Sequence, residues 1–231
     1  MDFFEAVEKR RSIRQFTKEK FTDDFVKKAL DAALLAPNSS NVQTWDFFWI
    51  KSEDKKAKVV EACMSQAAAR TASQLVVVTA DPRQWKRSVP SLISFVERVN
   101  APKVVHLYYR KLIPLTYRTG FLNCLAPLKW IASTAIGFVK PISRGPYTLR
   151  DLQGIAVKSA ALASENLMLA ITAQGGATCP MEGFDEWRLR KILPIRCSAE
   201  IVMVIGIGYA AERGTWGEQY RLPTSEVVHE L

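Results

Sequence analysis

A chain of 231 residues with 48% hydrophobic and 24% charged residues is long enough for one large domain and favours a folded, soluble protein. Two histidines and four cysteines without a CxxC pair argue against a His-based triad and a clustered metal site. The net charge of +9 is local, because residues 83–150 hold 12 Lys and Arg against one acid, and the other residues hold 20 against 22. The charged N-terminus lacks the apolar core of a signal peptide, which favours a reducing, cytoplasmic setting.

A basic segment follows the first predicted helix, which covers residues 2–10. Three arginines and a serine lie within five positions, in the run Arg10-Arg11-Ser12-Ile13-Arg14. Guanidinium groups and a hydroxyl gathered at a helix end can hold a phosphate through charge and forked hydrogen bonds. A solvated basic surface is the alternative, and this segment alone leaves both interpretations open.

A polar loop, residues 36–45, follows the next predicted helix. That helix begins at Thr22, with two acids in its first turn, and ends at Pro37. The loop holds Asn, Ser, Ser, Asn and Gln within six positions, which is more than a turn requires. Such amides and hydroxyls suit a planar polar ligand, and an ordinary polar connection is the alternative.

The rest of the chain is predicted from its apolar patterns. In chain order, the predicted elements are a strand at 45–50, a helix at 54–69, a strand at 75–79, a helix at 152–174, a strand at 177–179, a helix at 185–192 and a strand at 201–208. The continuous apolar run at 75–79 predicts a central strand covered on both faces. The helix at 152–174 is rich in small apolar residues and is expected to be buried. The tail after the last strand carries Trp216 and Tyr220 without periodicity, so it is expected to pack against another surface.

Four segments, in this order, resemble motifs of the FMN-dependent nitroreductase family. They are RRSIRQF at 10–16, APNSSNVQTW at 36–45, CPMEGFDE at 179–186 and YRLP at 220–223. Each motif is weak alone, but their order and spacing together are specific. The resemblance covers about residues 1–82 and 150–231. Asn38 stands where the family usually has Ser, and Thr44 where Pro is usual, and neither change affects the phosphate-binding segment.

The resemblance implies an α+β, nitroreductase-like fold, with a mixed, mainly antiparallel sheet flanked by helices in an intertwined homodimer. Residues 1–231 would form one such domain, with an insertion at about 83–149. The tail would reach over the partner subunit, and the long small-residue helix would lie in the dimer core.

The resemblance also implies an FMN site whose contacts are assigned by position. Arg10, Ser12 and Arg221 would hold the phosphate. Arg11 would lie along the ribityl chain, and Arg14 near the N1 edge of the flavin. Further implied flavin contacts are Asn38, Ser39, Ser40 and Asn41 from the partner chain, with Gln66, Pro180, Met181, Glu182, Gly183 and Gln219. A backbone N–H near Glu182 would face N5, and Gln219 occupies a usually basic position.

The activity implied by this resemblance is hydride transfer from NADH or NADPH, through flavin N5, to an electron-poor acceptor such as a nitroaromatic, quinone or enone. The cycle would be ping-pong, and no protein side chain is required as a catalytic group. Cys179 is expected to be a buried structural cysteine. An FMN-binding sensor or storage protein is the alternative. Nucleic-acid binding is not expected, because no RNP, zinc-finger or helix-turn-helix motif accompanies the basic segment.

The insertion at 83–149 lies outside the resemblance and is basic and aromatic. Its apolar stretch at 121–139 contains Pro127 and Lys129, which argues against a membrane span. Three interpretations remain open: a helical lid with a solvated basic face, a lid that attracts an anionic substrate, and a patch that makes peripheral contact with anionic lipid.

Overall fold

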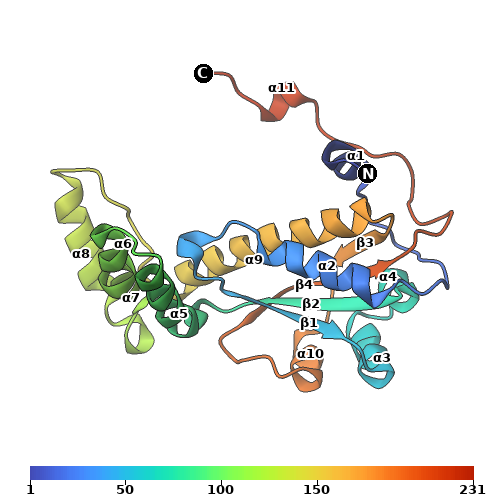
Figure 1. Ribbon diagram of the computed structural model, residues 1–231, viewed down its shortest axis with the longest axis horizontal. Helices are drawn as coiled ribbons and strands as arrows, with labels where there is room; N and C mark the ends of the chain where they lie inside the picture. Colours follow the sequence, from blue (N-terminus) through green and yellow to red (C-terminus); the bar gives the residue numbers. More distant parts are fainter.

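A four-stranded sheet in the order β1-β2-β4-β3 lies at the centre of the computed structural model, which describes residues 1–231 (Figure 1). The strands are β1 (Trp45–Ile50), β2 (Gln74–Ala80), β3 (Ala177–Met181) and β4 (Glu200–Gly208). Every residue of β2 is buried. This confirms the prediction that the apolar run at 75–79 forms a central strand.

All four strands pair antiparallel, which corrects the expected mixed sheet. The last residues of β1 pair with the first of β2, as in Ile50↔Leu75. The connection between these strands therefore begins and ends at the same end of the sheet, and parallel pairing would need a crossover to the other end. The single parallel pairing outside the strands is the bridge between Ser12 and Thr178.

Helices cover both faces of the sheet. The helices outside the insertion are α1 (Phe3–Lys9), α2 (Asp23–Leu34), α3 (Glu53–Ala62), α4 (Ala67–Thr71), α9 (Leu149–Ala173), α10 (Glu186–Ile192) and α11 (Thr224–Val227). One core cluster joins α2 and α9 to the sheet, and it contains side chains such as Val76 and Ile205. A second cluster joins α3, α4 and α10 to the opposite face, through alternate strand residues such as Val77 and Val204.

The long helix α9 organises the first of these faces. It begins at a capping box in which Thr148 and Asp151 each bond the backbone of the other. Its buried residues recur every three or four positions and include Ala160, Leu167 and Ile171. By length and composition α9 could cross a membrane, but the same properties suit the core helix of a folded domain, and here it packs against α2 and the sheet.

The helix expected at 54–69 is interrupted. α3 ends at Ala62, and α4 begins only at Ala67. Met64 and Ser65 between them adopt left-handed backbone angles, with φ of 57° and 50°. The turn gives Gln66 an extended backbone at the N-terminus of α4, so the break decides where this predicted site residue points.

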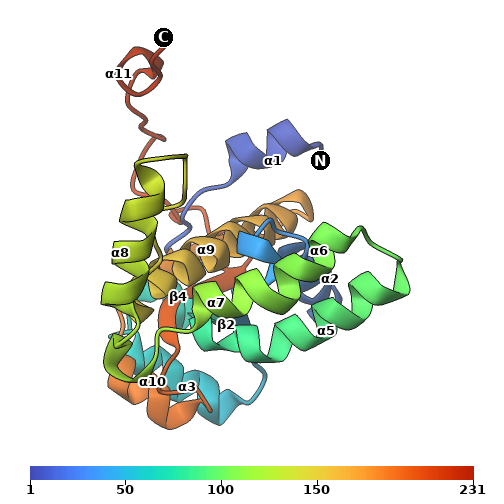
Figure 2. The same cartoon turned by 90° about the vertical axis from the view of Figure 1, so that its left-hand side faces the viewer.

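The insertion is mainly helical, except for residues 138–148, which contain no helix, and it projects from one end of the sheet (Figures 1 and 2). Its elements are α5 (Trp85–Arg98), α6 (Lys103–Leu107), a π-helical turn (Tyr108–Leu112), α7 (Ile113–Tyr117) and α8 (Ala126–Gly137). The apolar stretch at 121–139 forms a short turn and the 12-residue α8. A helix of this length spans about 18 Å, which is too short for a bilayer core of about 30 Å. Trp130, Phe138 and Val139 are exposed, and the lipid-contact interpretation stays a prediction.

We expect Leu167→Ala to lower the free energy of unfolding by about 2–5 kcal/mol, because it leaves a cavity between α9 and the sheet. Leu167 is 0% exposed. Urea denaturation followed by circular dichroism measures the change. Lys158→Ala, at an exposed position of α9, is the matched control and should change stability by less than about 0.5 kcal/mol. Equal losses in both variants would contradict this assignment of the core.

Candidate functional site

Backbone hydrogen bonds hold the basic N-terminal segment between the sheet and the C-terminal tail. The N–H of Ile13 donates to the carbonyl of Thr178 at 2.9 Å, beside the bridge between Ser12 and Thr178. One residue later, the N–H of Arg14 donates to the carbonyl of Gly214 at 2.7 Å. A Cβ on Gly214 would lie 2.9 Å from Cγ2 of Ile13, so the absence of a side chain permits this close approach. Segments about 200 positions apart in sequence thus meet at β3.

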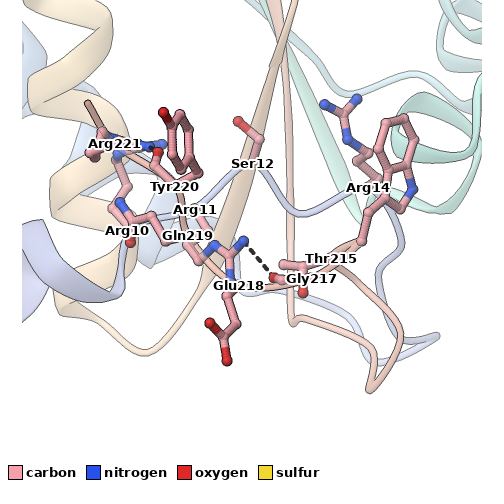
Figure 3. A pocket seen from close by; sticks show the side chains of 11 residues that line it. Arg10, Arg11, Ser12, Arg14, Thr215, Gly217, Glu218, Gln219, Tyr220 and Arg221 are labelled. Atoms are coloured by element: carbon pink, nitrogen blue, oxygen red, sulfur yellow. Dashed lines mark hydrogen bonds between the residues drawn. The ribbon is translucent and has the colours of Figure 1, made fainter. Parts of the chain in front are cut away.

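A cavity of about 330 Å³ lies where the N-terminal segment and the tail meet (Figure 3). Its lining residues are Arg10, Arg11, Ser12, Arg14, Thr215, Trp216, Gly217, Glu218, Gln219, Tyr220 and Arg221. In Figure 3, Arg10 and Arg221 lie on one side of Ser12 and Arg14 on the other. The structure therefore brings together the phosphate-binding residues predicted from two distant motifs, along with Arg11, Arg14 and Gln219.

The four arginines of this cavity are partly engaged by the protein. Arg10 lies 3.4 Å from the carboxylate of Glu165 on α9, and Arg11 donates to the carbonyl of Gly217 at 2.8 Å. The guanidinium of Arg14 stacks on the ring of Trp216, 4.1 Å from its centroid. Against these four cations, the cavity holds one carboxylate, Glu218. Forked guanidinium donors beside a serine hydroxyl match the oxygens of a phosphate group.

Sequence reasoning missed five lining residues, namely Thr215, Trp216, Gly217, Glu218 and Tyr220. The signal that could have found them was the tail itself. Its aromatic residues show no periodicity, and Trp216 is 86% exposed apart from its contact with Arg14. An aromatic residue that a chain leaves uncovered on its own is a candidate for a ligand or partner surface.

The predicted flavin segment at 180–183 begins in β3, two residues after Thr178, which forms the bridge with Ser12. Alternation along the strand directs the side chain of Met181 into the core, where it is 4% exposed. Its side chain therefore cannot line an open site, and only its backbone is available. Glu182 and Gly183 are exposed, and Pro180 is half-buried. The side-chain amide of Gln66 donates to the carbonyl of Gly183 at 2.8 Å, so the two predicted contacts support one another.

The polar loop at 38–41 forms a strained turn. Ser40 and Asn41 have φ of 57° and 53°, and Gln43 follows with 52°, although residues other than glycine rarely adopt left-handed angles. Asn38 stabilises the turn, because its side-chain oxygen accepts from the backbone N–H of Gln43 at 2.8 Å. The amide of Asn38 is thus already used inside the loop.

Within one chain, this loop lies away from the arginine cavity. Ser39 and Ser40 line a different cavity together with Ile155 of α9, whereas Arg10 pairs with Glu165 of the same helix. Ten residues of α-helix separate these positions, which corresponds to about 15 Å. Figure 1 shows the loop near the start of α9 and α1 near its other end. A single chain does not bring the predicted halves of the flavin site together.

The thiol of Cys179, beside the predicted flavin segment, is buried in surroundings that disfavour its reactive thiolate form. Burial raises the pKa of Cys179, although the nearby Arg14 acts in the opposite direction. Burial also raises the pKa of Cys63, to about 11. The expectation that Cys179 has a structural role agrees with this environment. No group of three or more His, Cys, Asp or Glu side chains converges on a common point that could hold a metal ion.

Comparison with known proteins gives one consistent result. A sequence model described as the Nitroreductase family matches residues 7–209, which include the insertion. NADH dehydrogenase of Thermus thermophilus is 27% identical over 228 residues, covering 99% of this chain and 95% of its own. MhqN of Bacillus subtilis, provisionally named an NAD(P)H nitroreductase, is 26% identical and covers 98% of both chains. A protein of Exiguobacterium sibiricum, provisionally called a nitroreductase and solved with FMN, superposes with a TM-score of 0.73 at 26% identity, covering 100% of this chain and 98% of its own.

We expect a disulfide reagent such as DTNB to label two thiols quickly, Cys124 and Cys197, because both are exposed. Cys63 should label slowly, since a pKa of about 11 leaves about one thiol in a thousand ionised at pH 8. The absorbance of the released thiolate counts the thiols. The double variant Cys124→Ser/Cys197→Ser should lose the fast phase, and a fast phase that persists would show that Cys179 or Cys63 is reactive.

Proposed function

The chain belongs to the nitroreductase family, and we propose on that premise that it passes a hydride from NADH or NADPH to an electron-poor small molecule. It is an NAD(P)H-dependent oxidoreductase, and FMN is its cofactor. The proposed acceptors are nitroaromatics, quinones or enones, reduced in a ping-pong cycle. A reducing, cytoplasmic setting is part of the proposal and agrees with four cysteines that form no disulfide.

The arginine cavity is the observation that carries this proposal. A phosphate monoester carries nearly two negative charges at neutral pH, and the cavity has four guanidinium groups against a single carboxylate. The donor set of Arg10, Ser12 and Arg221 therefore fits the phosphate end of FMN. Of the four cavity arginines, only Arg10 has a carboxylate partner in the chain, Glu165, so a bound phosphate would supply an opposite charge to the other three guanidinium groups.

Bound FMN supplies the hydride chemistry, and the residues of the chain bind and orient it. Arg14 is held by its stacking on Trp216, which would place a fixed cation beside the isoalloxazine ring. A nearby cation favours the extra electron density that a flavin receives on reduction. Gln66 fixes the Gly183 carbonyl, and with it the backbone at Glu182 that we assign to the N5 side. No side chain is required as nucleophile or general base.

We further propose that the enzyme is a homodimer in which each flavin is bound by both chains. The loop at 38–41 and the arginine cavity contact α9 about 15 Å apart, so a second chain is needed to complete the site. Large apolar side chains left exposed by the single chain support this assembly. They include Phe3, Phe4, Leu34, Leu35, Leu162, Trp216 and Leu222.

An FMN-binding sensor or storage protein would use the same phosphate contacts, so the decisive experiment is reduction. We expect the purified protein to show a flavin absorption spectrum that bleaches when NADH or NADPH is added without oxygen. The faster nucleotide identifies the donor. A bound flavin that neither nucleotide reduces would favour the sensor or storage function, and failure to bind added FMN would contradict the proposal.

The double variant Arg10→Ala/Arg221→Ala should weaken FMN binding by at least about tenfold, because two charge-assisted contacts are lost. Equilibrium titration followed by flavin fluorescence quenching measures the dissociation constant. The matched control is Lys18→Ala, which removes an exposed cation outside the cavity and should leave it unchanged. Equal weakening in the control would indicate only long-range electrostatics.

Mixed dimers test whether the site is shared between chains. One inactive variant carries Arg10→Ala/Arg221→Ala, and the other carries alanine at Ser39, Ser40 and Asn41. Random exchange of the two chains creates dimers with one intact site, so the mixture should recover about a quarter of wild-type activity. A mixture no more active than the mean of its components would show that each site is built from a single chain.

A further inference from the structure

The insertion encloses a second cavity, of about 650 Å³, with a different chemical character from the arginine cavity. Eleven of its 19 lining residues are hydrophobic. They come from the π-helical turn, α7, α8, the segment at 142–147 and, with Ile155, from α9. This volume lies within the range of small-molecule sites, about 300–1,000 Å³. Lys129 is the one charged residue in the lining, which contains no carboxylate.

Lys129 reaches this cavity from one face of α8. Leu128, Ala132, Ser133 and Ile136 line the cavity from the same helix, at spacings of three or four residues. The ammonium of Lys129 donates to the carbonyl of Thr116 on α7 at 2.8 Å. An ammonium has three donors, and no carboxylate lies within ion-pair distance of this one.

The surroundings of Lys129 disfavour the charged form of its side chain. Burial lowers the pKa of Lys129, which means that its charged form is incompletely solvated. A partly buried charge is stabilised when an opposite charge pairs with it and completes its hydrogen bonds. The empty donors of Lys129 therefore favour a ligand with a negatively charged oxygen, while the apolar walls favour a hydrophobic body.

The remaining polar atoms connect this cavity to the proposed flavin site. The hydroxyls of Ser40 and Tyr108 lie 2.5 Å apart, and those of Ser133 and Tyr147 lie 2.7 Å apart. Because Ser133 donates to the carbonyl of Trp130, the hydroxyl of Tyr147 donates to Ser133 and both of these donors are used, whereas the Ser40–Tyr108 pair keeps one free O–H in the cavity lining. Ser40 belongs to the loop that the proposed dimer places against the flavin of the partner. The cavity thus adjoins the position where an acceptor would receive its hydride.

We propose that this cavity holds the electron acceptor, and that the acceptor is an apolar aromatic molecule with one carboxylate that pairs with Lys129. This inference rests on the proposed function, because the redox role of the cavity depends on the neighbouring flavin. For a nitroaromatic carboxylate, the first turnover converts one NAD(P)H, one proton and the nitro compound into NAD(P)⁺, the nitroso compound and water. The carboxylate takes no part in this step and serves only to position the ring.

The test compares two ligands of equal shape that differ in charge, biphenyl-4-carboxylate and biphenyl-4-carboxamide. Neither is reduced, so calorimetric titration of the FMN-loaded protein measures binding without turnover. We expect the carboxylate to bind at least about tenfold more tightly, as a charge-assisted contact in a partly buried site would give. Lys129→Met should abolish this preference, and Lys129→Arg should keep most of it.

Lys140→Met is the matched control, because it removes an exposed cation of the same insertion outside the cavity. The preference for the carboxylate is a ratio within one variant, so a general loss of stability does not alter its meaning. An equal preference in wild type and Lys129→Met would overturn the inference, as would equal binding of the two ligands by the wild type.

Kinetic measurements distinguish a failure of this inference from a failure of the proposed function. With 4′-nitrobiphenyl-4-carboxylate as acceptor, Lys129→Met should raise KM at least about tenfold, whereas Lys140→Met should give the KM of the wild type. A flavin that NAD(P)H does not reduce would contradict the proposed function, while the calorimetric comparison would still decide whether the cavity binds the carboxylate. An unchanged KM in Lys129→Met would show that the acceptor does not bind in this cavity.

Discussion

Four guanidinium groups line one cavity of this protein, and backbone hydrogen bonds hold in place the N-terminal segment that carries three of them. The hydrogen bonds from Ile13 to Thr178 and from Arg14 to Gly214 provide this restraint, because they fasten the N-terminal segment between β3 and the tail. A site prepared in this way would suit the proposed phosphate, whose charge would pair with the guanidinium groups. The rest of the fold can be understood as support for this junction. β3 is itself anchored in a sheet whose two faces are covered by helices.

Helix α9 sets the second constraint, because it determines how far apart the polar loop and the arginine cavity lie. Both contact the same rigid helix, so neither can approach the other within one chain. The exposed apolar residues of α1, α2, α9 and the tail also favour the association of two chains. A monomer would leave them in water, whereas an association between two copies would both cover them and complete the site. Cofactor binding and subunit assembly would then stabilise one another.

The insertion adds a second cavity to the family fold, and under our proposal that cavity would give the enzyme its substrate preference. The arginine cavity beside the sheet is the proposed cofactor site, and the helices of residues 83–149 line a separate, mostly apolar cavity beside the polar loop. Site-specific chemistry in such a cavity depends on a few polar groups placed among hydrophobic walls. Here a single unpaired lysine is the most distinctive of them, and under the acceptor site that we propose the basic insertion would act as a lid for an anionic substrate.

The sequence by itself determined the family, the central apolar strand and the long buried helix, and it pointed to arginines that line one cavity, since these depend on local patterns and short motifs. It could not show that the 54–69 helix breaks at Met64, because the break needs left-handed backbone angles at Met64 and Ser65, which residues other than glycine rarely adopt. It also did not reveal that Met181 points into the core, that the tail contributes Trp216 beside Arg14, or that Lys129 lacks a carboxylate partner. Only the tertiary structure decided these points, because burial, stacking and charge pairing depend on residues that are distant in sequence and meet only when the chain folds.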